Sequence, residues 1–343
     1  MAKFSVLCPT GADSFQQFRY YAGFVDDYVH PPINYHGYAA CMGGCFHKDL
    51  SRIEQDETVL FLLSGNHAGS NLRVIRKLKA RGIRVLVSLK ETGLQQILSQ
   101  ISRPRTIKKL RAIFSYADGF ISPTESLISF YRALSQAPIE FIPTPYPIND
   151  VRWDFSIPIR QRQGIFLGTR EFFEWNRNHL FALLLLKRVL SETGETVTVM
   201  NTDGFRGVRL LKSLEFQSNR LNIISGKLPY SEYMSEMAKH KLVFQLDQST
   251  VPGQVAGDAI LCGLPCIGGN GTMESIAFPE LSLKAIDMDG ACQIAIKLCR
   301  DTDLQQYYIQ DSRKRAIENL SFEAVAIKIR DFIEVLSEKT CNR

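Results

Sequence analysis

The sequence predicts an α/β protein with two Rossmann-like parallel-sheet domains that face each other across a crevice. Short apolar runs alternate with amphipathic helical patterns along the chain, as expected for parallel strands that helices cover on both faces. The length of 343 residues exceeds one ordinary core and suits two domains of about 150 residues each. No low-complexity segment interrupts the alternation.

The first domain is expected over residues 1–150. Its predicted strands are short apolar or β-branched runs that end at polar, glycine or proline residues. Helical patterns cover 70–82 and 124–135, and four prolines between 143 and 160 mark an expected interdomain linker. The predicted strands cover 4–10, 58–64, 83–89, 119–123 and 139–144.

The second domain is expected over residues 151–320, where the same alternation starts again. Helical patterns cover 179–193, 207–215 and 231–240, and a fourth helix begins near Gly253 and ends at Cys262. The predicted strands cover 164–169, 196–202, 221–226, 242–246, 264–267 and 282–286.

A long amphipathic helix is expected over 322–339, inside a closing segment at 321–343. Its apolar residues recur at helical spacing, so one face of the helix must be buried. We expect this helix to cross back and pack toward the first domain. The apolar residues are Val325, Ile329, Phe332, Ile333 and Leu336.

The composition, 45% hydrophobic and 22% charged, is typical of a soluble globular protein. No apolar run reaches the roughly 18 residues of a membrane span, and the first residues lack the apolar stretch of a signal peptide. A net charge of +6 is small for a protein that coats nucleic acid. The eight scattered cysteines are expected to be reduced and buried, which indicates a cytoplasmic protein, with attachment to the inner face of a membrane as an alternative.

The stretch 242–274 carries the clearest functional signal. An apolar strand ends at Leu246 and a polar loop leads to the helix that begins near Gly253. A loop that enters a helix N-terminus offers free backbone N–H groups and a positive dipole end, which suit a phosphate. The glycine-rich turn 268–271 follows the next strand and allows close backbone approach to the same ligand. The stretch therefore predicts a nucleotide-diphosphate site at the carboxyl ends of a parallel sheet.

Three short runs resemble a known family. Gly168-Thr169-Arg170 lies at the end of the first predicted strand of the second domain, Asp258 opens a run through Ile267, and Ala117-Asp118 precedes the strand 119–123. Together they resemble glycosyltransferases of the GT-B fold, most closely the retaining family 4. The resemblance implies transfer of a sugar from a nucleotide-diphosphate sugar to an acceptor hydroxyl. It also implies retention of anomeric configuration, no metal, and no permanently bound cofactor beyond the donor substrate.

The resemblance assigns donor-binding roles in the second domain. Arg170 would contact the diphosphate and stabilise the leaving group, and Arg177 or Lys227 would be a second cation. The family carries two glutamates eight positions apart, for which this chain has Thr250 and Asp258. Asp258 would contact the ribose and Thr250 would lie near the sugar, whereas a helix charge and a turn cap are their alternative roles.

Further donor-side residues are expected around the same loops. Gly253 begins the helix, Gly269 lies in the glycine-rich turn, and Glu274 takes the place of a family acid that follows this turn. The alternative reading of Glu274 is a charge at a helix start.

The first domain would bind the acceptor. His67 follows the strand 58–64 and is the candidate for proton transfer or hydrogen bonding, with an ordinary loop histidine as the alternative. Gly11 and Asp13 follow the first strand, and Lys90 ends the third. All four are predicted on the acceptor side.

A basic run suggests a partner for the first domain. Its charges alternate with apolar residues on one expected helix over 101–114, which favours an anionic membrane surface or an acidic acceptor, or else a solvated helix face. The charged residues are Arg103, Arg105, Lys108, Lys109 and Arg111.

Other readings of the chain stay open. Asp287-Met288-Asp289 resembles a metal motif of another glycosyltransferase fold, but its place before a helix predicts a capping turn, and no metal site is expected. The family also carries a lysine after its glycine-arginine pair, near whose position this chain has Trp175 and Asn176, with Arg177 beside them. The absence of this lysine and of the first family glutamate motivates a non-catalytic GT-B subunit, or pseudoenzyme, that binds a partner. A nucleic-acid glycosyltransferase also shares the fold and would show steep salt dependence of acceptor binding.

Overall fold

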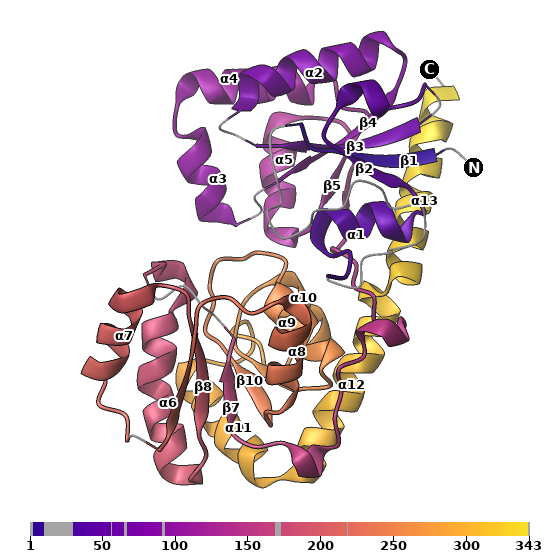
Figure 1. Ribbon diagram of the computed structural model, residues 1–343. Helices are drawn as coiled ribbons and strands as arrows, with labels where there is room; N and C mark the ends of the chain where they lie inside the picture. The colour runs from indigo at the N-terminus through magenta and orange to yellow at the C-terminus, as the bar shows by residue number, and fades with distance from the viewer. Residues whose placement is uncertain are drawn as a thin grey trace. The chain divides into compact units, whose positions relative to one another are not determined.

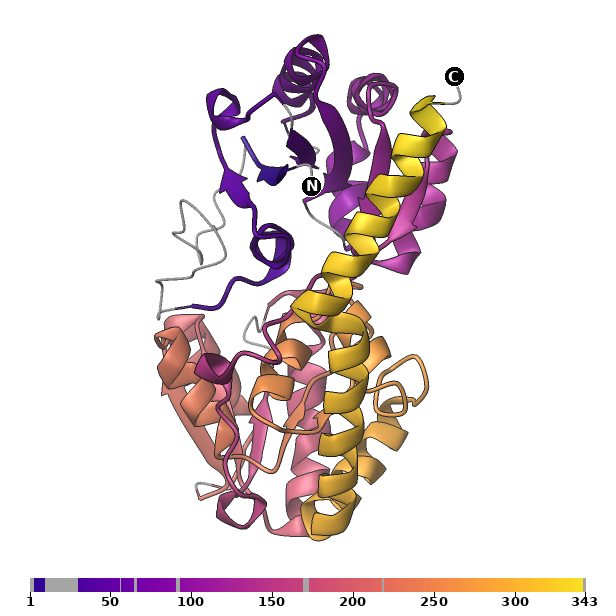
Figure 2. The ribbon, with the colours of Figure 1, turned by 90° about the vertical axis from the view of Figure 1, so that its right-hand side faces the viewer.

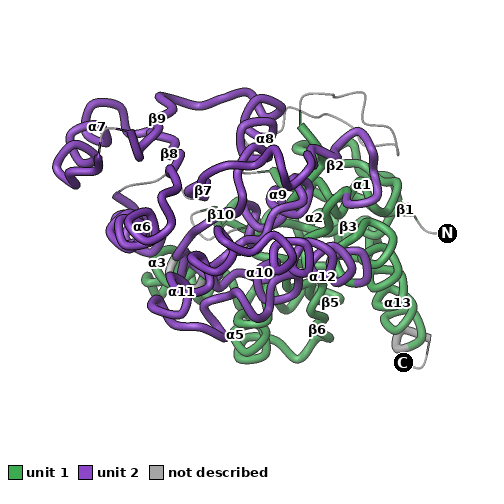
Figure 3. Tube along the Cα trace, turned by 90° about the horizontal axis from the view of Figure 1, so that it is seen from below, with its two compact units in different colours: residues 1–147, 319–343 green, residues 148–318 purple. Residues whose placement is uncertain are grey.

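The computed structural model describes residues 3–9, 30–55, 57–64, 67–90, 93–168, 173–217 and 219–341. The chain divides into two compact units, drawn in different colours in Figure 3. Unit 1 consists of Met1–Pro147 and Asn319–Arg343, and unit 2 consists of Ile148–Glu318. The passage from one unit to the other after Pro147 lies in the proline-rich segment at 143–160.

Unit 1 is built on a six-stranded sheet in the order β2-β1-β3-β4-β5-β6, and all its neighbouring strands are parallel (Figure 1). Apolar and β-branched residues dominate the central strands, as expected where helices cover both faces. The strands are β1 (Lys3–Leu7), β2 (Cys45–His47), β3 (Glu57–Leu63), β4 (Arg84–Leu89), β5 (Gly119–Ser122) and β6 (Ile139–Phe141).

Helices cover both faces of this sheet. Because successive side chains of a strand point to opposite faces, β3 contributes Leu60 and Leu62 to one core and Val59, Phe61 and Leu63 to the other. The first core also contains α1 (Asn34–Cys41) and α13 (Phe322–Cys341). The second contains α2 (Ala68–Ala80), α3 (Leu94–Ile101), α4 (Pro104–Phe114) and α5 (Ile128–Leu134).

The closing helix α13 packs on the sheet of unit 1 (Figure 2). Val325, Ile329, Phe332 and Leu336 are buried in the core with α1 and the strands, and Ile333 packs against it partly buried. Burial of side chains of this size stabilises a fold by about 1.5–3 kcal/mol each. The helical spacing of these apolar residues therefore has a physical explanation in one buried helix face.

The basic run of unit 1 lies on one helix, α4, with Arg103 as its N-cap residue, but the start expected at residue 101 is wrong because Ile101 ends α3. Helix α3 ends at Ile101, and α4 begins at Pro104. Proline lacks the N–H that a continuous helix needs and disfavours the helical region for the residue before it. Arg103 is accordingly extended, with φ −95° and ψ 127°.

Unit 2 contains a five-stranded parallel sheet in the order β11-β10-β7-β8-β9. Its strands are β7 (Ile165–Leu167), β8 (Val197–Asn201), β9 (Leu221–Ser225), β10 (Leu242–Phe244) and β11 (Cys266–Ile267). The helices of unit 2 are α6 (His179–Thr193), α7 (Gly204–Ser213), α8 (Tyr230–Ala238), α9 (Gln254–Leu261), α10 (Thr272–Ala277) and α11 (Met288–Arg300), and α12 (Thr302–Leu320) passes from unit 2 into unit 1.

One expected strand of unit 2 is absent. Residues 282–286 form turns, in which the N–H groups of Ala285 and Ile286 donate to the carbonyl of Ser282. The carbonyl of Ser282 thus has local partners in place of a neighbouring strand. Within the described ranges, no helix is both long and apolar enough to cross a membrane.

Candidate functional site

The candidate donor site lies at the carboxyl edge of the unit 2 sheet. Strands β11, β10 and β7 are consecutive and parallel, so the loops that follow them begin at the same edge. Ligands of open α/β sheets bind outside these carboxyl ends. The three loops contain the expected donor residues Arg177, Thr250, Gly253 and Gly269.

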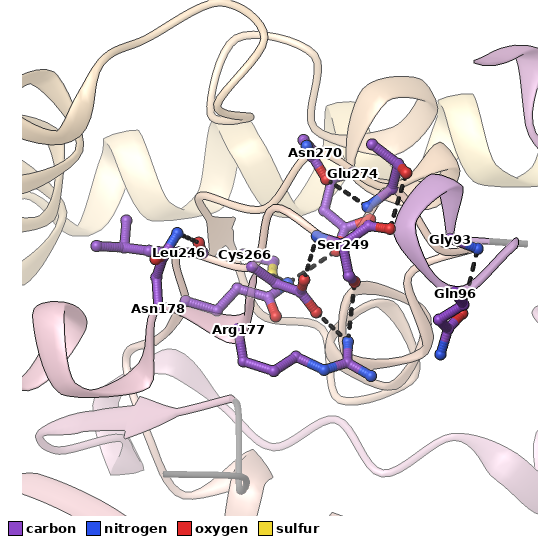
Figure 4. Close-up of polar contacts among 12 residues, drawn as sticks. Gly93, Gln96, Arg177, Asn178, Leu246, Ser249, Cys266, Asn270 and Glu274 are labelled. Carbon is purple, nitrogen blue, oxygen red and sulfur yellow. Dashed lines mark hydrogen bonds and ion pairs between the residues drawn. The ribbon is translucent and has the colours of Figure 1, made fainter. Parts of the chain in front are cut away.

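Asp247 joins these three loops through contacts with Arg177, Ser249 and Asn270, which Figure 4 labels. Its carboxylate forms an ion pair with Arg177, which ends a short 3₁₀ turn at Trp175–Arg177 after β7. The same carboxylate accepts a hydrogen bond from the N–H of Ser249 at 2.7 Å, and the carbonyl of Asp247 accepts one from the N–H of Asn270 at 3.0 Å. The loops after β7, β10 and β11 are therefore tied to one acidic residue.

Asn270 holds Thr250 in an unusual backbone conformation. The N–H of Thr250 donates to Oδ1 of Asn270 at 2.9 Å, and the Thr250 hydroxyl donates to the carbonyl of Ser249 at 2.7 Å. Thr250 has φ 53°, in the left-handed region that a β-branched residue rarely adopts. Such conformations cost on the order of 1–3 kcal/mol and cluster at ligand-binding sites.

Helix α9 presents its N-terminus to this edge of the sheet. Its N-cap is Gly253, with φ 94°, and no side chain of the described residues caps the helix. The first N–H groups of a helix have no partner within the helix, and its dipole favours an anion there. The end of α9 therefore has the backbone chemistry that a phosphate requires.

Glu274 lies beneath these loops. The side chain is buried, with 2% of the residue exposed, and its Oε1 accepts a hydrogen bond from Nε2 of Gln245 at 2.8 Å. Its buried Oε2 has no hydrogen-bond partner in the part of the chain that the structure describes. Burial raises the pKa of Glu274 to about 8, so the carboxyl group is largely neutral at pH 7.

Three glycines make room for the Glu274 carboxyl group. A Cβ at Gly253 or Gly271 would collide with Oε2, and a Cβ at Gly269 would lie 2.8 Å from Oε1. The glycine-rich turn thus serves the packing of a buried acid. The Glu274 carboxyl group packs against the glycines of two loops. Its contact with a donor stays a prediction.

Asp258 lies in the middle of α9, with 2% of the residue exposed. Its Oδ1 accepts a hydrogen bond from the hydroxyl of Tyr230, the first residue of α8, at 2.9 Å. This bond uses one of the carboxylate oxygens that a ribose would contact. The ribose role of Asp258 stays a prediction.

Of the three cations expected to bind the diphosphate, the structure describes only Arg177 among the loops after β7, β10 and β11. Arg170 lies outside the described residues, which stop at Gly168 and resume at Phe173. Arg177 is present at the edge of the sheet, but Asp247 balances its charge. Lys227 follows β9, which β8 and β7 separate from β10.

The acceptor-side candidates lie in unit 1. His67 is exposed and is the N-cap residue of α2, after β3. Lys90 follows β4, the neighbour of β3, and its N–H donates to the carbonyl of Leu63 at 2.7 Å. The structure therefore places both at the carboxyl edge of one sheet. Gly11 and Asp13 lie outside the described residues.

The Asp287-Met288-Asp289 run is a helix start, as predicted. Asp287 caps α11, because its carboxylate accepts a hydrogen bond from the N–H of Gly290 at 2.7 Å. Asp289 forms an ion pair with Arg188 at 2.6 Å. Among the residues with described positions, no three His, Cys, Asp or Glu side chains form a group that could hold a metal ion.

Sequence reasoning missed the residues that tie the loops together. Gln245, Asp247 and Asn270 are polar residues at the ends of apolar strands, and that placement is the signal that could have identified them. Their partners come from other loops, and spacing along the chain does not reveal such contacts.

No protein-family model matches the chain, and no curated protein matches it. Solved structures with the same architecture match the chain. A UDP-forming α,α-trehalose-phosphate synthase from Burkholderia xenovorans has a TM-score of 0.59 and 12% sequence identity, over 84% of this chain and 75% of that one. An O-GlcNAc transferase from Thermobaculum terrenum has a TM-score of 0.59 and 11% identity, over 99% of this chain and 68% of that one.

A third similar structure is the N-terminal domain of a trehalose-6-phosphate phosphatase from Candida albicans. Its TM-score is 0.61 at 7% identity, over 83% of this chain and 71% of that one. At these identities the likeness concerns the fold, and the chain has the two parallel-sheet domains of the GT-B fold. The three names differ in the reaction they describe, so the function must be argued from the site.

Proposed function

We propose that the chain transfers a sugar from a nucleotide-diphosphate sugar to an acceptor hydroxyl, with retention of configuration and without a metal ion. Unit 2 would bind the donor and unit 1 the acceptor. The names of two fold neighbours, a UDP-forming synthase and an O-GlcNAc transferase, support this reaction class. The retention and the independence from metal rest on the resemblance to family 4.

One observation carries the proposal. The N-terminus of α9, which no described side chain caps, lies at the carboxyl edge of the unit 2 sheet, beside loops that Asp247 and Asn270 hold together. Preorganised backbone donors bind a diphosphate without the cost of ordering the loops first. The nearby acid Glu274 is mostly uncharged at pH 7, so it adds little repulsion against a diphosphate.

In this proposal each donor residue has one task. Arg170 binds the diphosphate and stabilises the charge that develops on the leaving group, and Arg177 or Lys227 supplies further positive potential. Asp258 binds the ribose in place of the family's second glutamate, and Thr250 lies near the transferred sugar. His67 of unit 1 contacts the acceptor hydroxyl.

A donor screen tests the proposal. The protein is incubated with UDP-, GDP- and ADP-sugars, and the unfolding temperature and the released nucleotide are measured. We expect one donor to raise the unfolding temperature and to be hydrolysed slowly, because water replaces the missing acceptor. No shift with any nucleotide would contradict the proposal.

Thr250 keeps a second candidate open, a GT-B protein that binds a nucleotide sugar without transferring it. A threonine cannot supply the carboxylate that family members present to the sugar. Thr250→Glu separates the two candidates, with Thr250→Gln as the neutral control. Higher turnover of a hexose donor in the Glu variant alone supports an active site that is adapted to another sugar, and donor binding without turnover in all variants supports the non-catalytic protein.

A further inference from the structure

Unit 1 contains an open pocket of about 510 Å³ between α2 and α4, two helices that Figure 1 labels. The two helices pack side by side on the same face of the sheet. Helix α2 contributes its first turn, and α4 contributes its N-cap and first two turns. The main lining residues are Ala68 and Gly69 from α2, and Arg103, Arg105, Thr106 and Lys109 from α4.

Arg103, Arg105 and Lys109 line this pocket, and none of its described lining residues is acidic. The side chains of Arg103, Arg105 and Lys109 make no ion pair or hydrogen bond with any residue whose position the structure describes. Elsewhere in the same unit, Lys79 pairs with Asp118 at 2.7 Å. The pocket therefore has a concentrated positive potential that the described protein groups do not neutralise.

The helix geometry strengthens this positive potential. Neither α2 nor α4 has an acidic residue in its first turn, and no side chain with a described position caps the N-terminus of either helix. The Lys109 ammonium lies over the first turn of α2, because a Cβ at Gly69 would be 3.2 Å from its Nζ. Cations at the positive ends of helix dipoles repel one another unless an anion lies between them.

We propose that this pocket binds a phosphoryl group that the acceptor carries. The guanidinium groups of Arg103 and Arg105 suit the paired oxygens of a phosphate, Lys109 adds a point charge, and the Thr106 hydroxyl is a further donor. The pocket adjoins His67, the N-cap residue of α2, so a phosphate held here would place the rest of the molecule beside the candidate acceptor-side histidine.

The assignment of the phosphate to an acceptor rests on the proposed function, whereas binding of the phosphoryl group itself does not. The same chemistry has two sources, a soluble phosphate ester and the headgroup of an anionic lipid. Both would place oxygen anions among the same three cations. The binding test below uses no nucleotide sugar, so its failure is distinct from failure of the donor screen.

Helix α4 offers a matched pair of variants. Arg105→Gln with Lys109→Gln removes one Arg and one Lys that line the pocket. Lys108→Gln with Arg111→Gln removes one Arg and one Lys from exposed positions of the same helix that do not line it. The two double variants have the same net charge, so they separate a defined pocket from a diffuse basic surface.

Binding of inorganic phosphate and of glycerol 3-phosphate is measured by calorimetric titration at low ionic strength. We expect the pocket variant to bind at least tenfold more weakly than the natural protein, and the control variant to stay within twofold. Circular dichroism checks that both variants remain folded. An equal loss in the two variants overturns the proposal, because it indicates only a diffuse charge.

A second arm addresses the lipid source. Co-sedimentation is measured with phosphatidylcholine vesicles that contain or lack phosphatidic acid. Binding to phosphatidic acid that the pocket variant loses and the control variant keeps supports the proposal and assigns the phosphate to a lipid. Absence of binding to both soluble phosphates and to these vesicles overturns it.

Discussion

Gly253 leaves the space that the carboxyl group of Glu274 occupies: a Cβ at position 253 would collide with Oε2 of that side chain. The same glycine has φ 94° and is the N-cap of α9. Two independent requirements, a left-handed backbone and an absent side chain, thus coincide at one residue. Because of this contact, the candidate phosphate-binding helix end is coupled to a buried acid.

This coupling predicts a pH-dependent stability of unit 2. Burial raises the pKa of Glu274 to about 8, so between about pH 4.5 and 8 the folded chain keeps a proton that the unfolded chain releases. The stabilisation of the folded chain by this bound proton is fully present below about pH 4.5 and is lost as the pH rises through about 8. Glu274→Gln keeps the acceptor for Gln245 and removes the titration, so its stability relative to the natural protein should increase by on the order of 1 kcal/mol per pH unit across this window.

Tryptophan fluorescence during urea unfolding can measure this effect in unit 2 alone, because Trp153 and Trp175, the two tryptophans of the chain, both lie there. The control is Glu318→Gln, a change at an exposed position of α12. A stability difference that does not change with pH for Glu274→Gln would show that this carboxyl group is already ionised in the folded protein.

The ion pair between Arg177 and Asp247 predicts a measurable coupling. Both side chains are mostly buried, at 26% and 10% exposure, and Asp247 also accepts the N–H of Ser249. Exposed pairs contribute about 0–1 kcal/mol, whereas removal of one partner from a buried pair costs about 3–5 kcal/mol. For this intermediate case, a double-mutant cycle of Arg177→Met and Asp247→Asn should give a coupling of about 1–3 kcal/mol by urea unfolding.

A second double-mutant cycle at a more exposed ion pair is the control for this measurement. Arg188→Met and Asp289→Asn alter a pair that is more exposed and lies outside the loops after β7, β10 and β11. We expect a coupling below about 1 kcal/mol there. If the Arg177 pair showed no more coupling than this control, Asp247 would not hold the three loops together.

The left-handed backbone of Thr250 predicts that glycine is tolerated at this position. The conformation costs a β-branched residue about 1–2 kcal/mol, whereas the flexibility of glycine costs a folded chain about 0.5–1 kcal/mol. Thr250→Gly should therefore be at least as stable as Thr250→Val, which keeps the β-branch and removes the hydroxyl. Thermal unfolding of the two variants measures the difference, and a glycine variant that is clearly less stable than the valine variant would argue against strain at Thr250.

The sequence predicts well those elements whose apolar residues share one period. The helix 179–193 has the bounds of α6, and the apolar residues expected on one face of the last helix are those in the unit 1 core. Helix α12 was missed because its sequence, TDLQQYYIQDSRKRAIENL, is mostly polar and lacks a clear apolar stripe. Pro104 indicates the helix start in the sequence, but the apolar residues Ile101, Ile107, Leu110 and Ile113 continue one helical period across it.

The candidate site was predictable in position and less so in chemistry. Glycine placement and strand ends located the loops around Gly253 and Gly269. The role of Asp247 depends on contacts with residues 70 positions earlier and 23 positions later, at Arg177 and Asn270, and only folding brings these together. The same holds for Glu274, since its burial depends on three glycines from two loops.

The last prediction concerns Arg170, which follows β7 in the chain and which we propose as the diphosphate ligand. Arg160 precedes β7 and is exposed, so Arg160→Ala is a matched control that removes the same charge from before the strand instead of after it. A charge-assisted hydrogen bond contributes about 1.5–3 kcal/mol, which corresponds to a ten- to hundredfold change in affinity. Calorimetric titration with UDP and GDP should show this loss for Arg170→Ala, with an unchanged dissociation constant for Arg160→Ala. Equal affinities of the two variants would move the phosphate contact to another cation, and the proposed leaving-group role of Arg170 would then be wrong.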